Sequence, residues 1–306
     1  MRSLFDNSYL KSIFYALLVT LIFLGIPWLA HFFMIFVLSH FFIIDTAMGQ
    51  YIFGLFCALL VVLYCRRPGL LINIMQLKGA LKGLFVYGMP YLLFVGFLFV
   101  FLVNYMYTSR TLTSPFLFNL YRSQLLLFLL MALCSGIYEE VVFRGLIIHK
   151  IESLLKNKYL RTNTVFTILI SSVFFSLMHF TVIFTDGSGA SIAWQFIFSF
   201  IVGFYFAVIY LKSKTLIPCM VFHFFWNFTI VSLQFIRENH RLIPRSFLND
   251  LILINNYWLI ILFHVFIFLF SILLLVHHLK TSASPFLTTD AKVHTYTLKK
   301  ICSFMN

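Results

Sequence analysis

Two adjacent acids and a nearby arginine stand inside a run of apolar residues that is long enough to cross a bilayer. Glu139, Glu140 and Arg144 lie within the segment 124–148, whose remaining residues are mostly apolar. Each such charge costs about 2.5–3.5 kcal/mol at the centre of a membrane helix, so three of them oppose insertion strongly. A membrane helix tolerates charges where they face a protein interior, and there they usually serve a function.

The spacing predicts different environments for the two acids. In an α-helix, Glu140 and Arg144 lie four residues apart on one face, where they can form an ion pair. Glu139 points about 100° away and gains no such partner. We therefore expect one acid to be neutralised structurally, while its neighbour stays available as a general base or acid. The alternative is a structural charge cluster that holds helices together.

Two further apolar segments carry polar groups that could act with this acid. Phe175 and His179 lie four residues apart in one segment, and His223 and Asn227 lie four apart in another. Side chains at this spacing project from one face of a helix. Buried polar groups cost less when they meet partners, so we expect the three segments to converge on one hydrated pocket.

A count of residues from the expected cytoplasmic helix ends tests whether these groups can meet. Glu139 lies about nine residues deep and His223 about eight, whereas His179 lies about sixteen residues deep. At about 1.5 Å per residue, His179 stands too far toward the outer side. We expect its helix to begin later than assumed, or to be tilted or kinked.

The composition is that of a polytopic, all-α membrane protein. The 306 residues are 62% hydrophobic and only 10% charged, and the mean hydropathy is +0.99. Soluble domains are typically about 45–50% apolar and about 25% charged. The net charge of +13 is scattered over short loops. The positive-inside rule explains this scatter, which argues against a nucleic-acid partner.

Other polar residues in the apolar segments have simpler interpretations. His31 and His264 have no acid or amide at helical spacing and are expected to be packing residues. The cysteines lack the spacing of a disulfide framework or a zinc-thiolate site and are expected to be free thiols. They are Cys57, Cys65, Cys134, Cys219 and Cys302.

At about 20 residues per span, the sequence predicts eight transmembrane helices. They cover 13–38, 46–64, 83–105, 124–148, 163–184, 191–211, 215–236 and 254–276. With both termini cytoplasmic, sixteen Lys and Arg residues lie inside and five lie outside, which fits the positive-inside rule.

The same pattern suggests four regions. Residues 1–123 form an N-terminal three-helix membrane region, with an interfacial segment at 66–82 that mixes basic and apolar residues. Residues 124–236 form the core that carries the polar pairs, 237–278 form an outer loop and the last transmembrane helix, and 279–306 form a basic cytoplasmic tail.

Three motifs together resemble those of a known family. They are Glu139-Glu140-x-x-x-Arg144, Phe175-x-x-x-His179 and His223-x-x-x-Asn227, in this order, with Phe143 and Gly145 flanking the arginine and Pro218 ahead of the second histidine. The set is similar to that of the CPBP family, which comprises CAAX prenyl proteases and bacteriocin-processing enzymes and is also called Abi. The similarity covers roughly 125–228.

The resemblance implies an intramembrane endopeptidase with about eight helices and a cavity open to the membrane and the cytosol. Glu139 would activate the attacking water with help from His179. His223 and Asn227 would stabilise the oxyanion of the tetrahedral intermediate. Hydrolysis of a peptide bond needs such a base and such donors.

Three further positions have supporting roles by the same resemblance. Glu140 and Arg144 would orient the site, and Phe175 would support it. The sequence has no HExxH motif. Glu139, His179 and His223 could still hold a zinc ion with water as fourth ligand, although we favour chemistry without a metal.

Two other functions remain open at this point. The chain could be a non-catalytic membrane scaffold or bacteriocin-immunity protein of the same family, or a proton- or ion-coupled transporter in which intramembrane Glu and His form a relay. For an enzyme, the expected partners are membrane lipids and a membrane-associated peptide or protein, either prenylated, bacteriocin-like or a leader peptide. The expected location is the cell (inner or plasma) membrane, as a multi-pass protein.

Overall fold

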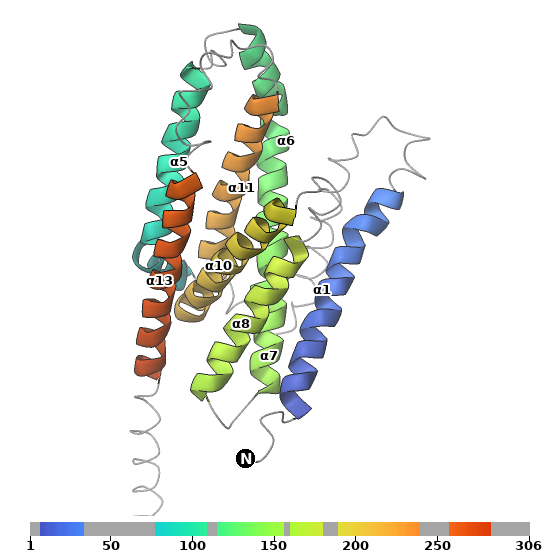
Figure 1. Ribbon diagram of the computed structural model, residues 1–306, viewed down its shortest axis with the longest axis vertical. Helices are drawn as coiled ribbons and strands as arrows, with labels where there is room; N and C mark the ends of the chain where they lie inside the picture. Colours follow the sequence, from blue (N-terminus) through green and yellow to red (C-terminus); the bar gives the residue numbers. More distant parts are fainter. Residues whose placement is uncertain are drawn as a thin grey trace, which may run out of the picture.

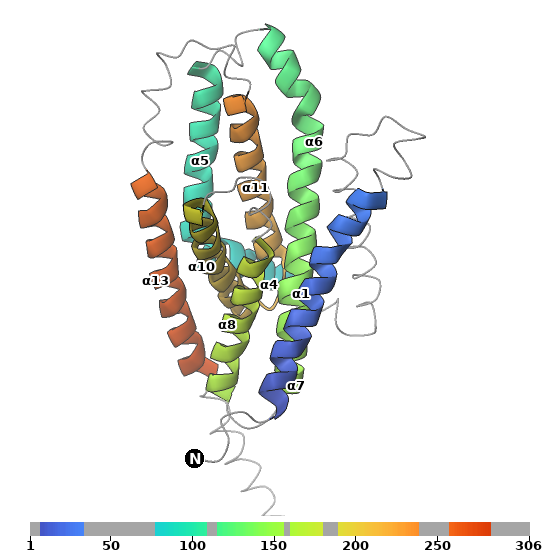
Figure 2. The same ribbon diagram turned by 45° about the vertical axis from the view of Figure 1, so that its right-hand side comes forward.

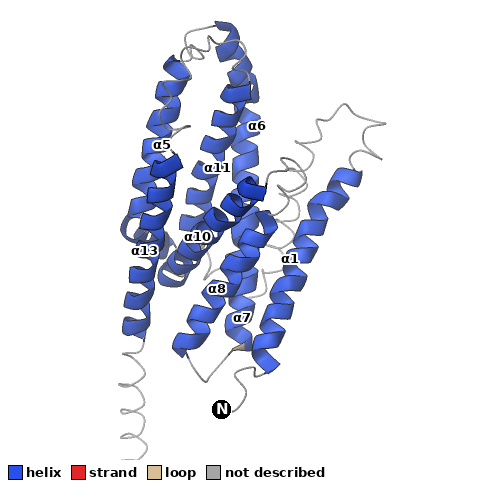
Figure 3. Ribbon diagram, in the orientation of Figure 1, coloured by secondary structure: helices blue, strands red, loops and turns tan. Residues whose placement is uncertain are grey.

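The computed structural model describes residues 7–33, 77–108, 115–155, 160–179, 189–238 and 257–282, where every regular element is a helix (Figure 3). Four of these helices are long and apolar enough to cross a membrane, or five if a bent pair counts as one span. The expected all-α class is therefore found over these residues. The helix expected at 46–64 and most of the interfacial segment at 66–82 lie outside the described residues.

One long helical rod forms the centre of the fold. The helix α6 (Pro115–Glu140) continues without a break into the π-helical stretch η3 (Val141–Ile148) and then α7 (His149–Leu154) (Figure 1). All residues of η3 except Leu146 are buried. The rod covers the helix predicted at 124–148 and extends it at both ends.

The other helices pack around this rod. The helix α11 (Ile217–Glu238) runs along α6, and α10 (Gly189–Ser213) packs against α8 (Leu160–Met178) (Figure 2). On the outside, α1 (Asn7–Phe33) contacts α8 and α7, while α13 (Tyr257–Ser282) contacts α10. The largest buried cluster centres on α10, with residues from α5, α11 and α13.

A sharp bend replaces the straight helix that the sequence predicts at 83–105. The helix α4 (Leu77–Lys82) and the π-helical turn η2 (Gly83–Tyr87) are followed, after Gly88, by α5 (Met89–Thr108). The axes on either side of Gly88 differ by 71°. Pro90 has no backbone N–H to continue the hydrogen bonding across the bend. The Tyr205 hydroxyl donates to the carbonyl of Tyr87 at 2.9 Å, which satisfies a group at the bend.

The outward faces of the peripheral helices are apolar. Exposed large side chains on α1, α5 and α13 include Phe14, Leu18, Leu93, Phe97, Leu269 and Leu273. A water-facing surface rarely carries apolar patches of this extent. These faces are suited to lipid, as the composition predicts.

The bend at Gly88 depends on the absence of a side chain, which predicts a stability difference between two glycines of the same region. A Cβ at Gly88 would overlap the ring of the buried Phe222 and come within 2.8 Å of the Gly83 carbonyl, whereas one at Gly96 would have no atom within 4 Å. Gly88→Ala should therefore lower the free energy of unfolding by about 1–3 kcal/mol. The apparent melting temperature of the purified protein in detergent measures this.

Gly96→Ala is the matched control. It should leave the melting temperature unchanged or raise it, because alanine favours helix over glycine by up to about 1 kcal/mol. Equal melting temperatures for the two variants would contradict the packing of Phe222 against the bend.

Candidate active site

A buried ion pair forms the base of the site. The Arg144 Nη1 donates to Glu140 Oε1 at 3.0 Å, and both side chains are fully buried. The Arg144 Nη2 donates to the carbonyl of Gly203 on α10 at 3.1 Å. Hydrogen bonds of this charge-assisted kind are the strong ones in protein interiors. The pairing expected from the four-residue spacing is present.

Two aromatic rings cover the guanidinium. The Cζ of Arg144 lies 4.4 Å from the ring centroid of Phe175 and 5.6 Å from that of Phe206. An arginine over an aromatic face gains cation–π stabilisation, which grows when water is excluded. Phe175 thus holds the arginine in place, and the ring of His179 packs against it in turn, with centroids 4.9 Å apart.

Close approach of α8 and α10 brings the Gly203 carbonyl to the arginine. A Cβ at Gly203 would come within 2.9 Å of Phe175 Cδ1 and 3.4 Å of Ser172 Cα. Small residues allow helices to approach in this way within membranes. Gly203 was not predicted from the sequence, where a glycine inside an apolar segment is the only signal for it.

The π-helical stretch that carries Arg144 is tied to the neighbouring helix. Ser171 on α8 donates its hydroxyl to the carbonyl of Phe143 at 3.0 Å, and the Phe143 and Phe175 rings meet edge to face at 5.3 Å. Wider helical turns of this kind occur frequently at functional sites. Ser171 was not predicted either, because a serine in an apolar helix gives no indication of its partner.

The second acid faces two imidazoles. The Nε2 of His223 lies 3.6 Å from Glu139 Oε2, and the Nε2 of His179 lies 3.9 Å from the same oxygen. These distances exceed a direct hydrogen bond, which ends at about 3.2 Å. Two imidazoles, one directly after α8 and one on α11, therefore face one carboxylate oxygen of α6 from beyond hydrogen-bonding distance.

The other nitrogen of each imidazole is already engaged. The Nδ1 of His223 lies 2.9 Å from Glu140 Oε1, and the Nδ1 of His179 lies 2.9 Å from the carbonyl oxygen of Phe175. Both oxygens accept hydrogen bonds, so we assign the proton of each ring to Nδ1. This fixes both rings so that their Nε2 atoms point toward Glu139.

Accessibility divides the site into a sealed part and an open part. The side chains of Glu140 and Arg144 have no exposed surface, and that of His223 is 6% exposed. Those of Glu139 and His179 are 12% and 22% exposed. The available acid thus lies at the edge of the site, while its Oε2, which faces the two imidazoles, is buried and has no hydrogen-bond partner among the described residues.

The depth of His179 follows from the placement of α8, not from a kink within it. Figures 1 and 2 show the first turn of α8 well below the first turn of α11, so the two helices do not begin at the same level. His179 directly follows the last residue of α8, whereas His223 lies in the second turn of α11. The expectation of a later start is wrong, since α8 begins at Leu160, and the count erred because it assumed level helix ends.

Asn227 lies one turn beyond His223 on α11, and its amide is held by a residue that the sequence analysis missed. Its Nδ2 donates to the hydroxyl of Ser135 on α6 at 2.7 Å, and this hydroxyl donates to the Met131 carbonyl at 2.9 Å. The helices α6 and α11 run in opposite directions (Figure 2). Ser135, one turn before Glu139 on α6, therefore lies at the same level as Asn227, one turn after His223 on α11. The Asn227 amide is therefore oriented by a neighbouring helix.

Among the described residues, no group of three His, Cys, Asp or Glu side chains has the placement of a metal site. Elsewhere, Cys134 and Cys219 are free thiols, and His264 packs against the ring of Phe198. The side chain of His31 lies outside the described part of the chain.

The two adjacent acids should differ sharply in their contribution to stability. Glu140→Gln leaves Arg144 buried without its counter-charge and should lower the free energy of unfolding by about 3–5 kcal/mol. Glu139→Gln removes an acid that pairs with no arginine or lysine and should cost no more than about 1 kcal/mol. Melting temperatures in detergent compare the two. A larger loss for Glu139→Gln would refute the assigned environments.

Comparison with known proteins finds one family that the segment around this site resembles. Residues 121–229, about a third of the chain, match the family model described as "Type II CAAX prenyl endopeptidase Rce1-like". No curated protein and no solved structure matches the chain. The matched segment contains all three motifs, so the part of the chain that holds Glu139, His179 and His223 is similar to the Rce1-like CAAX prenyl endopeptidases.

Proposed function

We propose that this integral membrane protein is an intramembrane endopeptidase that hydrolyses a peptide bond near the end of a membrane-associated protein or peptide. The family match supports a protease of the CAAX type. The observation that carries the proposal is the pair of imidazole Nε2 atoms that face Glu139 Oε2 at 3.6 and 3.9 Å, while the neighbouring acid is engaged by Arg144. A carboxylate placed in this way can act as a general base.

Glu139 takes a proton from a water molecule, which attacks the carbonyl carbon of the scissile peptide. His179, which lies on the accessible side of the site, helps to orient this water. When the C–N bond breaks, Glu139 returns the proton to the leaving amine. The base is thereby regenerated, and one water is consumed for each bond cleaved.

The negative charge of the tetrahedral intermediate is stabilised by His223 and Asn227. After His223 gains a second proton, at Nε2, it donates from Nδ1 to Glu140 and from Nε2 to the oxyanion. The Asn227 amide carries two N–H groups, of which one binds Ser135. Donors fixed before the reaction begins stabilise such a charge without reorganisation. Glu140 and Arg144 keep this donor set in place.

The proposal includes a topology and a location. We propose eight transmembrane helices with both termini on the cytoplasmic side, in the cell membrane, and the four regions 1–123, 124–236, 237–278 and 279–306. The placement of basic residues supports the orientation. Substrates are prenylated CaaX tails or leader-type and bacteriocin-like peptides, and the proposed chemistry needs no metal.

Cleavage by the purified protein in detergent tests the assignment. A fluorogenic peptide with a farnesylated CaaX tail and an unmodified leader-type peptide serve as substrates. Glu139→Gln should lower kcat about 10²–10⁴-fold, because it removes the base. His223→Ala and Asn227→Ala should each lower kcat about 10²–10³-fold, because each removes an oxyanion donor.

His149→Ala, which changes an exposed histidine of the same rod, is the control and should retain full activity. Full cleavage by Glu139→Gln would reject the proposal. A scaffold or immunity protein would keep its phenotype in this variant, and a transporter would instead show ion-dependent uptake in liposomes. Loss of activity with chelator that is reversed by zinc would overturn the metal-free mechanism.

Ser135 should act as a positioning residue for Asn227. Ser135→Ala removes one hydrogen bond worth about 1 kcal/mol, so kcat should fall about fivefold with little change in KM. Ser135→Thr retains a hydroxyl and should restore activity. Ser153→Ala is the control, because this hydroxyl contacts only a carbonyl of its own helix. An unchanged kcat for Ser135→Ala would remove Ser135 from the site.

A further inference from the structure

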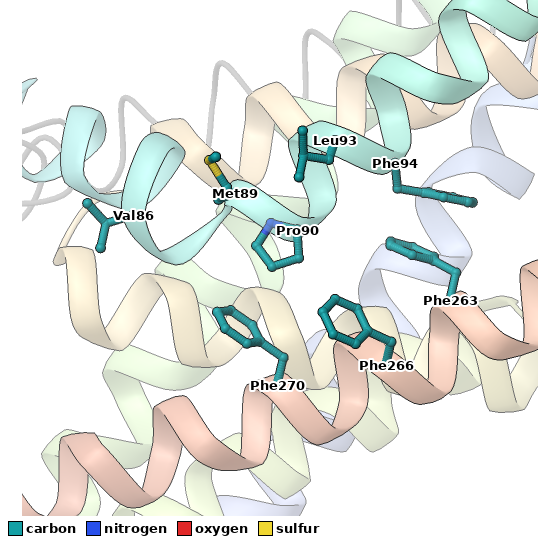
Figure 4. A pocket seen from close by; sticks show the side chains of 8 residues that line it. All are labelled: Val86, Met89, Pro90, Leu93, Phe94, Phe263, Phe266 and Phe270. Carbon is teal, nitrogen blue, oxygen red and sulfur yellow. The ribbon is translucent and has the colours of Figure 1, made fainter.

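A second feature lies on another side of the molecule, between α5 and α13. It is an apolar groove of about 570 Å³ lined by residues that include Val86, Met89, Leu93, Phe94, Phe266 and Phe270 (Figure 4). We call it the α5–α13 groove. Every lining side chain is a hydrocarbon or a thioether. A pocket of this volume is large enough for a small ligand, and its lining selects an apolar one.

Stacked aromatic rings close one end of the groove. The rings of Phe94 and Phe263 lie 3.5 Å apart between centroids, at an angle of 10° (Figure 4). Trp226 stacks behind Phe94 at 6.1 Å. The opposite end is lined by Val86 and Phe270 (Figure 4). Val86 is followed in the chain by Tyr87, so this end of the groove adjoins Tyr87.

Positive charge gathers around Tyr87. Lys82 on α4 and Lys212 on α10 both lie over the ring of Tyr87, with their Nζ atoms 5.6 and 5.0 Å from its centroid. The Nζ of Lys212 lies 3.0 Å from His277 Nδ1 on α13. Within the described residues, no ion pair joins either lysine to an acid. We call Lys82, Lys212 and His277 the Tyr87 cluster.

We propose that this site binds an anionic glycerophospholipid, with one acyl chain in the α5–α13 groove and the phosphate on the Tyr87 cluster. The charge favours a lipid with net negative charge over a zwitterionic one, because each lysine near a headgroup adds attraction. The α5–α13 groove favours a lipid over a free phosphate, because a free phosphate has no apolar part to bind in the groove. Lys82 and Lys212 belong to segments that the positive-inside rule assigns to the cytoplasmic side, so the lipid comes from the inner leaflet.

This inference is independent of the proposed protease function. The groove is built from η2, α5 and α13, whereas the candidate active site is built from α6, η3, α8 and α11. Loss of lipid binding and loss of cleavage are thus separate results, measured by separate assays.

Quenching of Trp226 fluorescence by brominated lipid tests the proposal, because this ring stacks on a residue that lines the groove. The other tryptophans, Trp28, Trp194 and Trp258, are replaced by Phe, and the full chain is reconstituted in phosphatidylcholine vesicles. Phosphatidylglycerol brominated on an acyl chain is then titrated in, with brominated phosphatidylcholine in a parallel series. Half-maximal quenching should occur at a mole fraction about five- to thirtyfold lower for phosphatidylglycerol, as expected for one or two lysine contacts.

Variants separate the headgroup contact from the chain contact. Lys82→Gln with Lys212→Gln should abolish the preference for phosphatidylglycerol, whereas Lys82→Arg with Lys212→Arg should keep it. Lys150→Gln is the matched control, because this lysine also lies over a tyrosine, with Nζ 5.9 Å from the ring of Tyr15 on another face. Leu93→Phe fills the groove at an exposed position and should weaken quenching by both lipids.

Equal quenching by the two lipids, or a preference that survives the double Gln substitution, would overturn the proposal. A farnesylated peptide is also tested as a competitor. If it relieves quenching at a lower concentration than non-brominated phosphatidylglycerol, the proposal is overturned, because the groove then binds the substrate. Relief by inorganic phosphate alone would reduce the site to a simple anion site and reject the lipid. The single substitutions Lys82→Gln and Lys212→Gln decide the question if the double variant does not fold, since each alone should reduce the preference.

Discussion

One carboxylate oxygen holds the candidate active site together. Glu140 Oε1 accepts hydrogen bonds from Arg144 within its own rod and from His223 on α11, at 3.0 and 2.9 Å. Arg144 in turn reaches the Gly203 carbonyl on α10 and the Phe175 ring on α8. Four helices are therefore joined through a single buried ion pair. Because both charges are fully buried, either one alone would be strongly destabilising, and the geometry is strictly defined as a result.

Because of this buried ion pair, Glu140 has a structural role while the adjacent Glu139 stays unpaired with an arginine. The buried acid fixes the imidazole of His223, and the backbone of α8 fixes that of His179, so Glu139 faces two rings of set orientation. Glu139 itself remains partly exposed and lies beyond direct hydrogen-bonding distance of both rings. Adjacent residues in sequence thus have different environments: Glu140 is fully buried and paired with an arginine, whereas Glu139 is partly exposed.

The sequence predicted what depends on local spacing and missed what depends on tertiary contact. The four-residue spacing of Glu140 and Arg144 was sufficient to predict their pairing, because helical geometry alone sets it. The contributions of Gly203, Ser171 and Ser135 depend on which helix lies opposite, and no spacing reveals that. The bend at Gly88 and the low starting level of α8 were missed for the same reason, since both depend on neighbouring helices. The roles in catalysis stay predictions.

The π-helical stretch η3 lets the rod carry an extra residue without turning the helix that follows. A π-turn holds one residue more than the α-turn it replaces, so deletion of a single residue between 141 and 148 would allow the rod to relax into regular α-helix. The residues of α7 would then keep their orientation toward α1 and α8, because the wide turn absorbs the residue that is lost. The change would instead be felt inside the stretch, where the Phe143 carbonyl accepts the hydrogen bond of Ser171. In alignments of related chains, a one-residue gap in this stretch should therefore shift the residues around Arg144 and leave the faces of α7 unchanged.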